Sequence, residues 1–167
     1  MTLGQSFSAT LEVQSSLLAA PTSLPVQLTV GNPPPDPNSW DGWFQTNFQR
    51  TPTAADVTSD TDGDGLPNFL EFATGGNPNN PASHAGLPKI HSSADGQITW
   101  SYLRRKSLTA AQLAPEGSEN LTIWQTLPAG KPDSTVTESS YNADFQQVLV
   151  SVPLTASSYF FRIRATP

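Results

Sequence analysis

The sequence predicts a mainly β fold, a sandwich of short strands with a small helical segment and an N-terminal β-hairpin. Several runs of residues alternate between apolar and polar side chains, which is the pattern of half-buried strands. In residues 40–48 the aromatic side chains instead recur every three to four positions, which is the spacing of one face of a helix. A proline-rich spacer at residues 31–38 separates the first two alternating runs from the rest of the chain.

The first two runs predict the hairpin. One run alternates strictly from Phe7 to Val13, and the second alternates from Val26 to Val30. A two-stranded hairpin on its own is marginally stable in water. We therefore expect it either to fold back on its own chain or to add its strands to a neighbouring domain or subunit. The second outcome would give fibres if the contacts did not close into a ring.

The aromatic residues after the spacer predict a short helix. Ser39 can cap its start, and four aromatic residues follow at helical spacing, namely Trp40, Trp43, Phe44 and Phe48. We interpret them as core residues that pack against Phe69 and Phe72. The alternative interpretation is a carbohydrate-binding accessory module of a polysaccharide-degrading enzyme, because flat rings can stack on sugars. Its candidate residues are Trp40, Trp43, Trp100 and Trp124.

Residues 60–71 follow the calcium-binding pattern of an EF-hand loop. Oxygen-bearing side chains occupy loop positions 1, 3, 5, 9 and 12, and Gly65 occupies position 6, where a sharp turn is needed. The predicted ligands are the side chains of Asp60, Asp62, Asp64, Asn68 and Glu71 and the backbone carbonyl of Leu66. Carboxylates this close repel one another unless a cation such as Ca²⁺ lies among them. The alternative is a solvated acidic turn.

The loop departs from the paired EF-hands of calcium sensors. Position 8 is Pro67, which has no N–H to bridge to a second loop, and the sequence holds no second loop. Residues 51–59 show no helical periodicity, so we expect no leading helix that could move when calcium binds. A helix should follow the loop and end at Gly75 and Gly76. Calcium should therefore anchor this helix rather than operate a switch.

The remainder of the chain predicts strands at the short spacing of a fibronectin III or Ig-like sandwich. Residues 97–102 alternate after a tight turn and should form a hairpin with the residues around Ile90. Further strands are predicted at residues 108–114, 121–127, 135–139, 145–152 and 159–165. In the last strand, Arg162 and Arg164 should form a cationic face opposite an apolar one. We thus expect four parts: a hairpin at 1–30, a linker at 31–38, a calcium segment at 39–82 and a sandwich at 83–167.

Composition argues against several functions. The net charge of −6 and the lack of a basic stripe argue against nucleic acid as a partner. No apolar run approaches the roughly 20 residues that span a bilayer, and the first residues do not resemble a signal peptide, so we expect a piece of a longer protein. Only 13% of residues are charged, against about 25% in an average domain, and cysteine is absent. Calcium could then supply the stabilisation that disulfides give other extracellular domains.

We expect no catalytic activity. The two histidines, His84 and His91, read as exposed loop residues, and neither accompanies a serine in a strand-turn-helix elbow. A glycosidase needs two carboxylates in a cleft, and the clustered carboxylates of this chain are assigned to calcium.

Residues 39–167 resemble a known bacterial module. The segments "W..WF…F", "DTDGDGLPNFLEFATGGNP", "ADGQITWSYLRR", "ENLTIWQTLP" and "YFFRIRATP" are similar to the C-terminal module repeated in large secreted proteins of environmental bacteria. The resemblance implies a calcium segment followed by a β-sandwich, with Asp60, Asp62, Asp64, Asn68 and Glu71 as ligands. It also implies a non-catalytic, extracellular or cell-surface part of adhesins, surface proteins or polysaccharide-degrading enzymes. Its partners would be neighbouring domains or subunits of the same surface protein or fibre, or glycans.

A second resemblance concerns the N-terminus. The stretch "SFSATLEVQSSLLAAPTSLPVQLTV" is similar to the closing strands of the Ig-like BACON or choice-of-anchor domains of bacterial surface proteins. The resemblance implies that the hairpin is the end of a larger sandwich, whose missing strands it would have to replace with other contacts.

Overall fold

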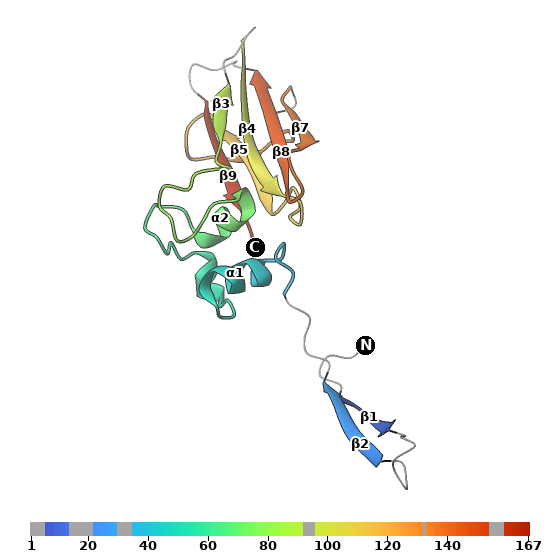
Figure 1. Cartoon of the computed structure of the whole chain (residues 1–167). Helices are drawn as coiled ribbons and strands as arrows, with labels where there is room; N and C mark the ends of the chain where they lie inside the picture. The colour runs from blue at the N-terminus through green and yellow to red at the C-terminus, as the bar shows by residue number, and fades with distance from the viewer. Residues whose placement is uncertain (1–5, 14–21, 30–34, 92–95, 132, 154–158) are drawn as a thin grey trace. The chain divides into compact units, whose positions relative to one another are not determined.

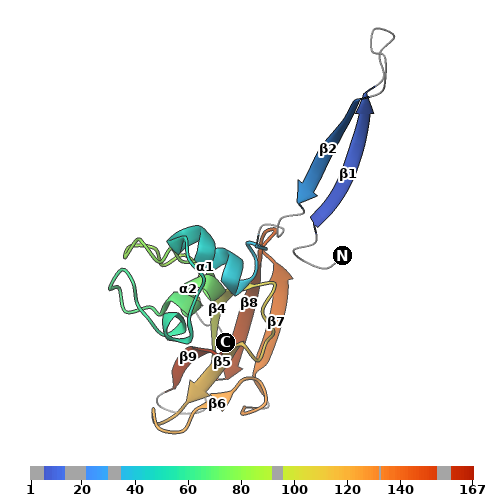
Figure 2. The ribbon, with the colours of Figure 1, turned by 90° about the horizontal axis from the view of Figure 1, so that it is seen from below.

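The computed structural model divides the chain into two compact units, Met1–Pro34 and Pro35–Pro167. Figure 1 and Figure 2 show both units. The residues that it describes are 6–13 and 22–29, for the backbone alone, and 35–91, 96–131, 133–153 and 159–167. The region predicted as a tight turn before Gly96 lies mostly outside them.

The first unit contains the predicted hairpin. Strand β1 (Ser6–Val13) pairs antiparallel with β2 (Thr22–Thr29), which begins earlier than the predicted run. The register sets Phe7 opposite Leu28 and Leu11 opposite Leu24. The register thus sets apolar positions of the two strands opposite one another, as expected for the predicted hairpin.

The two α-helices of the second unit confirm the sequence prediction. Helix α1 (Trp40–Phe48) is capped by Ser39, whose hydroxyl accepts from the Gly42 N–H at 3.0 Å. Helix α2 (Asn68–Thr74) ends at Gly75 in the left-handed conformation. The aromatic residues of both helices form one cluster, with Trp43 and Phe72 at 5.6 Å between ring centroids. The predicted packing of the aromatic residues is thus observed.

The segment between these helices holds a feature that the prediction missed. Residues Ala54–Val57 form a single 3₁₀ turn, η1, begun by a capping box between Thr53 and Asp56. Arg50 donates to both oxygens of Asp56, and this contact and the bonds from Thr53 hold the pKa of Asp56 well below its usual range. Periodicity cannot detect one turn of helix, because the pattern needs several turns to emerge.

Most of the regular secondary structure of the second unit lies in two antiparallel sheets, which confirms the mainly β class. The four-stranded sheet has the order β3 (Lys89–His91), β4 (Gln97–Arg105), β8 (Phe145–Pro153) and β7 (Thr135–Ser140). The three-stranded sheet has the order β6 (Gln125–Thr126), β5 (Leu113–Ser118) and β9 (Phe160–Ala165). Figure 1 shows α1 and α2 gathered at one end of these strands.

Two predicted strands were misplaced. Residues 108–112 form turns, and the strand begins only at Leu113 and runs to Ser118. The predicted strand at 121–127 shrinks to Gln125–Thr126, because Ser118 and Asn120 accept backbone N–H groups of the loop that follows. Such local bonds compete with strand pairing, and alternation alone does not reveal them.

The core contains side chains from both sheets. Trp100 and Tyr102 on β4 are almost fully buried, and so are three alternating residues of β8, namely Val148, Val150 and Val152. The ring centroids of Trp100 and Phe161 of β9 lie 5.6 Å apart. The Tyr102 hydroxyl donates a hydrogen bond to the Leu113 carbonyl of β5. The alternation predicted for β4 and β8 therefore identified the buried face correctly.

The final strand carries the two arginines that were predicted to form a cationic face. Both bind the buried Glu116 of β5, with Arg162 Nε at 2.7 Å and Arg164 Nε at 2.6 Å from its oxygens. Burial by itself would raise the pKa of Glu116, but the hydrogen bonds from Arg164 and Arg162 outweigh it and lower the pKa. The charge of this face is thus partly neutralised within the sheet.

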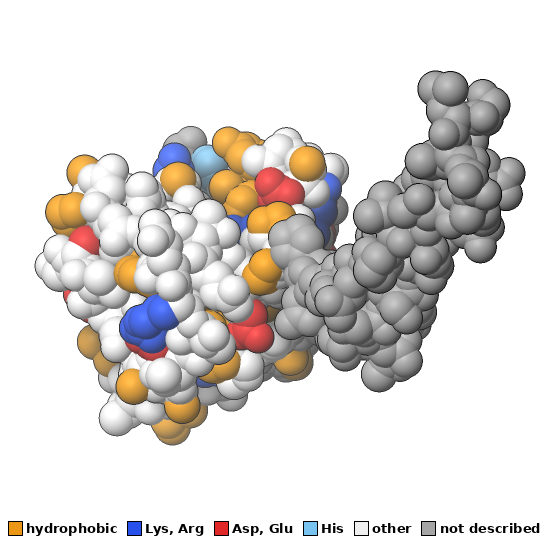
Figure 3. Space-filling model, turned by 60° about the horizontal axis from the view of Figure 1, so that its bottom comes forward, with side chains coloured by type: hydrophobic (Ala, Val, Ile, Leu, Met, Phe, Trp, Pro, Cys, Tyr) orange, Lys and Arg blue, Asp and Glu red, His pale blue; other side chains and the backbone are white. Residues whose placement is uncertain are grey.

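One face of the second unit carries few charges (Figure 3). On the face in Figure 3, charged side chains are scattered among uncharged polar atoms and small apolar areas. Within the described residues, no helix combines the length and the apolar character needed to cross a membrane.

Candidate metal centre

Three carboxylates meet in the loop before α2. Asp60, Asp62 and Asp64 each offer one oxygen, and these oxygens all lie within 4.8 Å of one another. Three negative charges at this separation repel strongly, and a cation among them would remove the repulsion. This group could therefore hold a metal ion.

Backbone N–H groups shape the loop around the carboxylates. Asp60 accepts from the N–H groups of Gly63 and Gly65, each at 2.8 Å. Gly65 has a φ of +90° and Gly63 a φ of +79°, in the left-handed region that favours glycine. The predicted turn at Gly65 is confirmed. The need for glycine at Gly63 was not predicted, although its place between two aspartates was visible.

Five buried side-chain oxygens near the loop have no hydrogen-bond partner in the structure. They are Asp62 Oδ2, Asp64 Oδ2, Asn68 Oδ1, Glu71 Oε1 and Glu71 Oε2. Each unpaired buried oxygen costs about 1–3 kcal/mol, so five in one region are unusual for a folded protein. All of them belong to residues that the sequence predicted as ligands.

Glu71 lies in the first turn of α2 and is fully buried. Burial above all, and then the negative charges of Asp62, Asp64 and Asp60, raise its pKa to about 7. The absence of a side chain at Gly76 leaves room for the Glu71 side chain, because a Cβ on Gly76 would lie 2.9 Å from the Glu71 Cβ. Glu71 does not belong to the group of carboxylates whose oxygens lie within 4.8 Å of one another. The negative charges of that group nevertheless contribute to its raised pKa.

Asn68 is held so that one of its atoms remains available. Its side-chain amide donates to the Asp56 carbonyl at 3.2 Å, and its backbone N–H donates to the Ser59 carbonyl at 2.8 Å. The carbonyl oxygen Oδ1 is then the acceptor left without a partner. Leu66, the predicted backbone ligand, is fixed through its N–H, which donates to Asp64 Oδ1 at 2.7 Å.

Two neighbours of the predicted ligands were missed. Asp56 holds the amide of Asn68 through its carbonyl. His84 lies with its Nδ1 3.6 Å from Asp64 Oδ2 and has a half-exposed side chain. Both contacts depend on how the loop folds against distant residues, and no local pattern in the sequence indicates them.

The second histidine corrects a prediction. His91 lies on strand β3 rather than in a loop, and its Nε2 is 2.8 Å from Ser101 Oγ on the neighbouring strand β4. The contact joins the neighbouring strands β3 and β4.

None of the four tryptophans, all of which are described, is freely exposed. Trp43 and Trp100 are buried, and Trp40 is packed against the same core. Trp124 is half-buried, with the guanidinium of Arg162 4.1 Å from its ring centroid. Trp40 and Trp124 therefore keep part of their surface exposed, whereas Trp43 and Trp100 do not.

Comparisons with models of protein families, with curated proteins and with solved structures found no match to the chain. The resemblance to a bacterial module therefore stays a prediction.

Proposed function

We propose that residues 60–71 bind one Ca²⁺ ion, which stabilises a non-catalytic structural module. The observation that carries the proposal is the set of five buried oxygens that have no hydrogen-bond partner among the described residues, all on Asp62, Asp64, Asn68 and Glu71. Ca²⁺ is bound by six to eight ligands, all of which can be oxygen atoms. Asp60, Asp62, Asp64, Asn68, Glu71 and the carbonyl of Leu66 would supply them.

A structural role suits the packing around the site better than a sensory one. Phe69 and Phe72 of α2 are buried in the aromatic cluster, and the preceding segment has only the single turn η1. Calcium sensors instead open a pair of helices and expose an apolar groove. An ion here would join the loop to the first turn of α2, since Glu71 would contribute its ligands from that helix.

The setting that we propose is extracellular. Only 13% of residues are charged and cysteine is absent, and surfaces of low charge are common outside cells. In the bacterial modules that residues 39–167 resemble, a calcium segment precedes a β-sandwich, and we propose a fibronectin III-like or Ig-like sandwich here from the short strand spacing. Millimolar calcium outside cells would keep a site of about 10⁻⁴ M affinity occupied. The module would belong to a surface protein, an adhesin or a fibre.

Calorimetric titration of the chelator-treated protein with CaCl₂ tests the proposal. We expect one site with a dissociation constant of about 10⁻⁴ M, and weaker binding of Mg²⁺, which demands a smaller octahedral shell. Glu71→Gln removes a charged ligand and should weaken calcium binding by about tenfold or more.

Asp133→Asn is the matched control, because Asp133 is an exposed carboxylate outside the loop. It should leave the affinity unchanged. Absence of calcium binding, or equal weakening by the two substitutions, would contradict the proposed site.

We propose further that the hairpin β1–β2 assembles the protein by adding its strands to a neighbouring subunit. The hairpin is a compact unit of two strands, and two strands alone are marginally stable. Strand addition would supply hydrogen bonds for its unpaired edges.

Deletion of residues 1–34 tests this assembly. Light scattering should show oligomers of the full chain and monomers of the shortened one, which keeps the whole second unit. If both forms are monomers over a wide range of concentration, strand exchange is refuted. Retained calcium binding in the shortened chain would show that the second unit still folds.

A further inference from the structure

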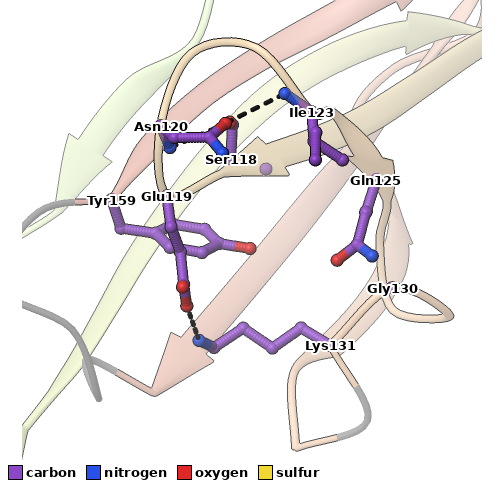
Figure 4. Close-up of a pocket in the computed structure, with 9 residues that line it drawn as sticks. Ser118, Glu119, Asn120, Ile123, Gln125, Gly130, Lys131 and Tyr159 are labelled. Carbon is purple, nitrogen blue, oxygen red and sulfur yellow. Dashed lines mark hydrogen bonds and ion pairs between the residues drawn. The ribbon is translucent and has the colours of Figure 1, made fainter.

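A cavity of about 220 Å³ lies apart from the metal loop. Its lining residues come from the end of β5, from β6, from the loops that follow these two strands, and from Tyr159 just before β9. Figure 4 shows these residues around the cavity. None of its lining residues belongs to residues 60–71. Drug-sized ligands occupy pockets of roughly 300–1,000 Å³, so this cavity has room for a single small ring.

Two glycines leave space for the side chains that form the cavity. A Cβ on Gly117 would collide with the hydroxyl of Tyr159, and a Cβ on Gly130 would collide with the side chain of Gln125. Any other residue at these positions would have to displace a wall of the cavity. Tyr159 and Gln125 can therefore lie where Figure 4 shows them, on facing sides of the hollow.

The cavity offers neutral hydrogen-bonding groups. The Tyr159 hydroxyl and the Gln125 side-chain amide line it, and neither has a hydrogen-bond partner within the part of the chain that the structure describes. Asn120 accepts the Ile123 N–H through Oδ1 at 2.9 Å, which orients its amide group. Burial, and to a lesser extent the charge of Glu119, raises the pKa of Tyr159, so the hydroxyl remains a donor at neutral pH.

The charges at the cavity cancel. Lys131 Nζ lies 3.5 Å from Glu119 Oε1 and 4.6 Å from the centroid of the Tyr159 ring. An anionic or cationic ligand would therefore find no excess of opposite charge. The Tyr159 ring and the exposed side chain of Ile123 add apolar surface beside the polar groups. A sugar ring can place its C–H face against an apolar surface while its hydroxyl groups bond to neutral donors and acceptors beside that surface.

We infer that this cavity binds one neutral sugar ring, with Tyr159 and Gln125 as its hydrogen-bonding residues. The inference is independent of the proposed calcium role and does not use the tryptophans. A peptide backbone could also bond to amide and hydroxyl groups, but an extended strand needs an open groove longer than one ring.

Titration of the ¹⁵N-labelled, calcium-supplied protein with single sugars tests the inference. The probes are glucose, galactose, mannose and N-acetylglucosamine, each raised to about 50 mM because one ring with few hydrogen bonds binds at millimolar concentration. We expect saturable shifts of the Asn120 and Gly130 amides with at least one sugar. Tyr159→Phe, which removes only the hydroxyl, should weaken that binding about three- to tenfold.

Tyr141→Phe is the matched control, because Tyr141 is an exposed tyrosine that does not line this cavity. It should leave the affinity unchanged, and Gln125→Ala should weaken it. Absence of saturable shifts with all four sugars would overturn the inference. So would shifts that are insensitive to both Tyr159→Phe and Gln125→Ala, or equal binding of a short neutral peptide such as triglycine.

Discussion

Replacement of Arg105 by alanine should lower the free energy of unfolding by about 2–4 kcal/mol. Arg105 is buried at the end of β4, where its Nε donates to the Phe72 carbonyl at 2.9 Å and its Nη1 to Asn38 Oδ1 at 3.1 Å. Its guanidinium lies 4.6 Å from the ring centroids of both Phe72 and Phe145. Alanine would leave a cavity, unpaired polar groups and two uncovered rings where α2 meets the sheet.

Urea denaturation of the two proteins at fixed calcium concentration measures this effect. Arg105→Lys should recover only part of the loss, because an ammonium cannot stack and bond in two directions as the planar guanidinium does. Lys89→Ala, an exposed cation on β3, should change stability by less than about 0.5 kcal/mol. An Arg105→Ala protein as stable as the Lys89→Ala protein would contradict the assigned role.

Without metal, the protein should lose stability as the pH rises from about 4.5 to about 7. The cause is Glu71, whose pKa in the folded chain is raised to about 7 from an ordinary value of 4.5. Between these values the folded state holds a proton that the unfolded state has lost, so each step up in pH favours unfolding. Calcium needs the ionised carboxylate, so the stabilisation it adds should grow over the same range.

Thermal unfolding with chelator and with about 1 mM calcium checks this prediction. At a dissociation constant near 10⁻⁴ M, this concentration adds roughly 1.4 kcal/mol at neutral pH. Glu71→Gln has no titrating group at this position, and its stability should vary less with pH in the absence of metal. Curves for the parent protein that coincide with and without calcium at every pH would contradict it.

Patterns within a few residues were enough to predict the candidate ligands and most of the elements. The spacing of residues 60–71 picked out Asp60, Asp62 and Asp64, whose carboxylates the structure brings together, because a loop of this length is shaped mainly by its own glycines and N–H groups. Ser39 and Gly75 marked helix ends for the same reason. Alternation identified the buried faces of β4 and β8 because one face of each must leave water.

Only the tertiary structure decided which distant groups meet. No local pattern marks Arg105 as a core residue, yet it is buried between two aromatic rings that are far from it in the sequence. No pattern in the sequence indicated that the Glu116 carboxylate accepts hydrogen bonds from both arginines of β9. Tyr159 and Gln125 share a cavity through the pairing of β5 with both β6 and β9. A local sequence pattern records which face of an element is apolar, but hydrogen bonds, ion pairs and cavities depend on the partner that packing brings to that face.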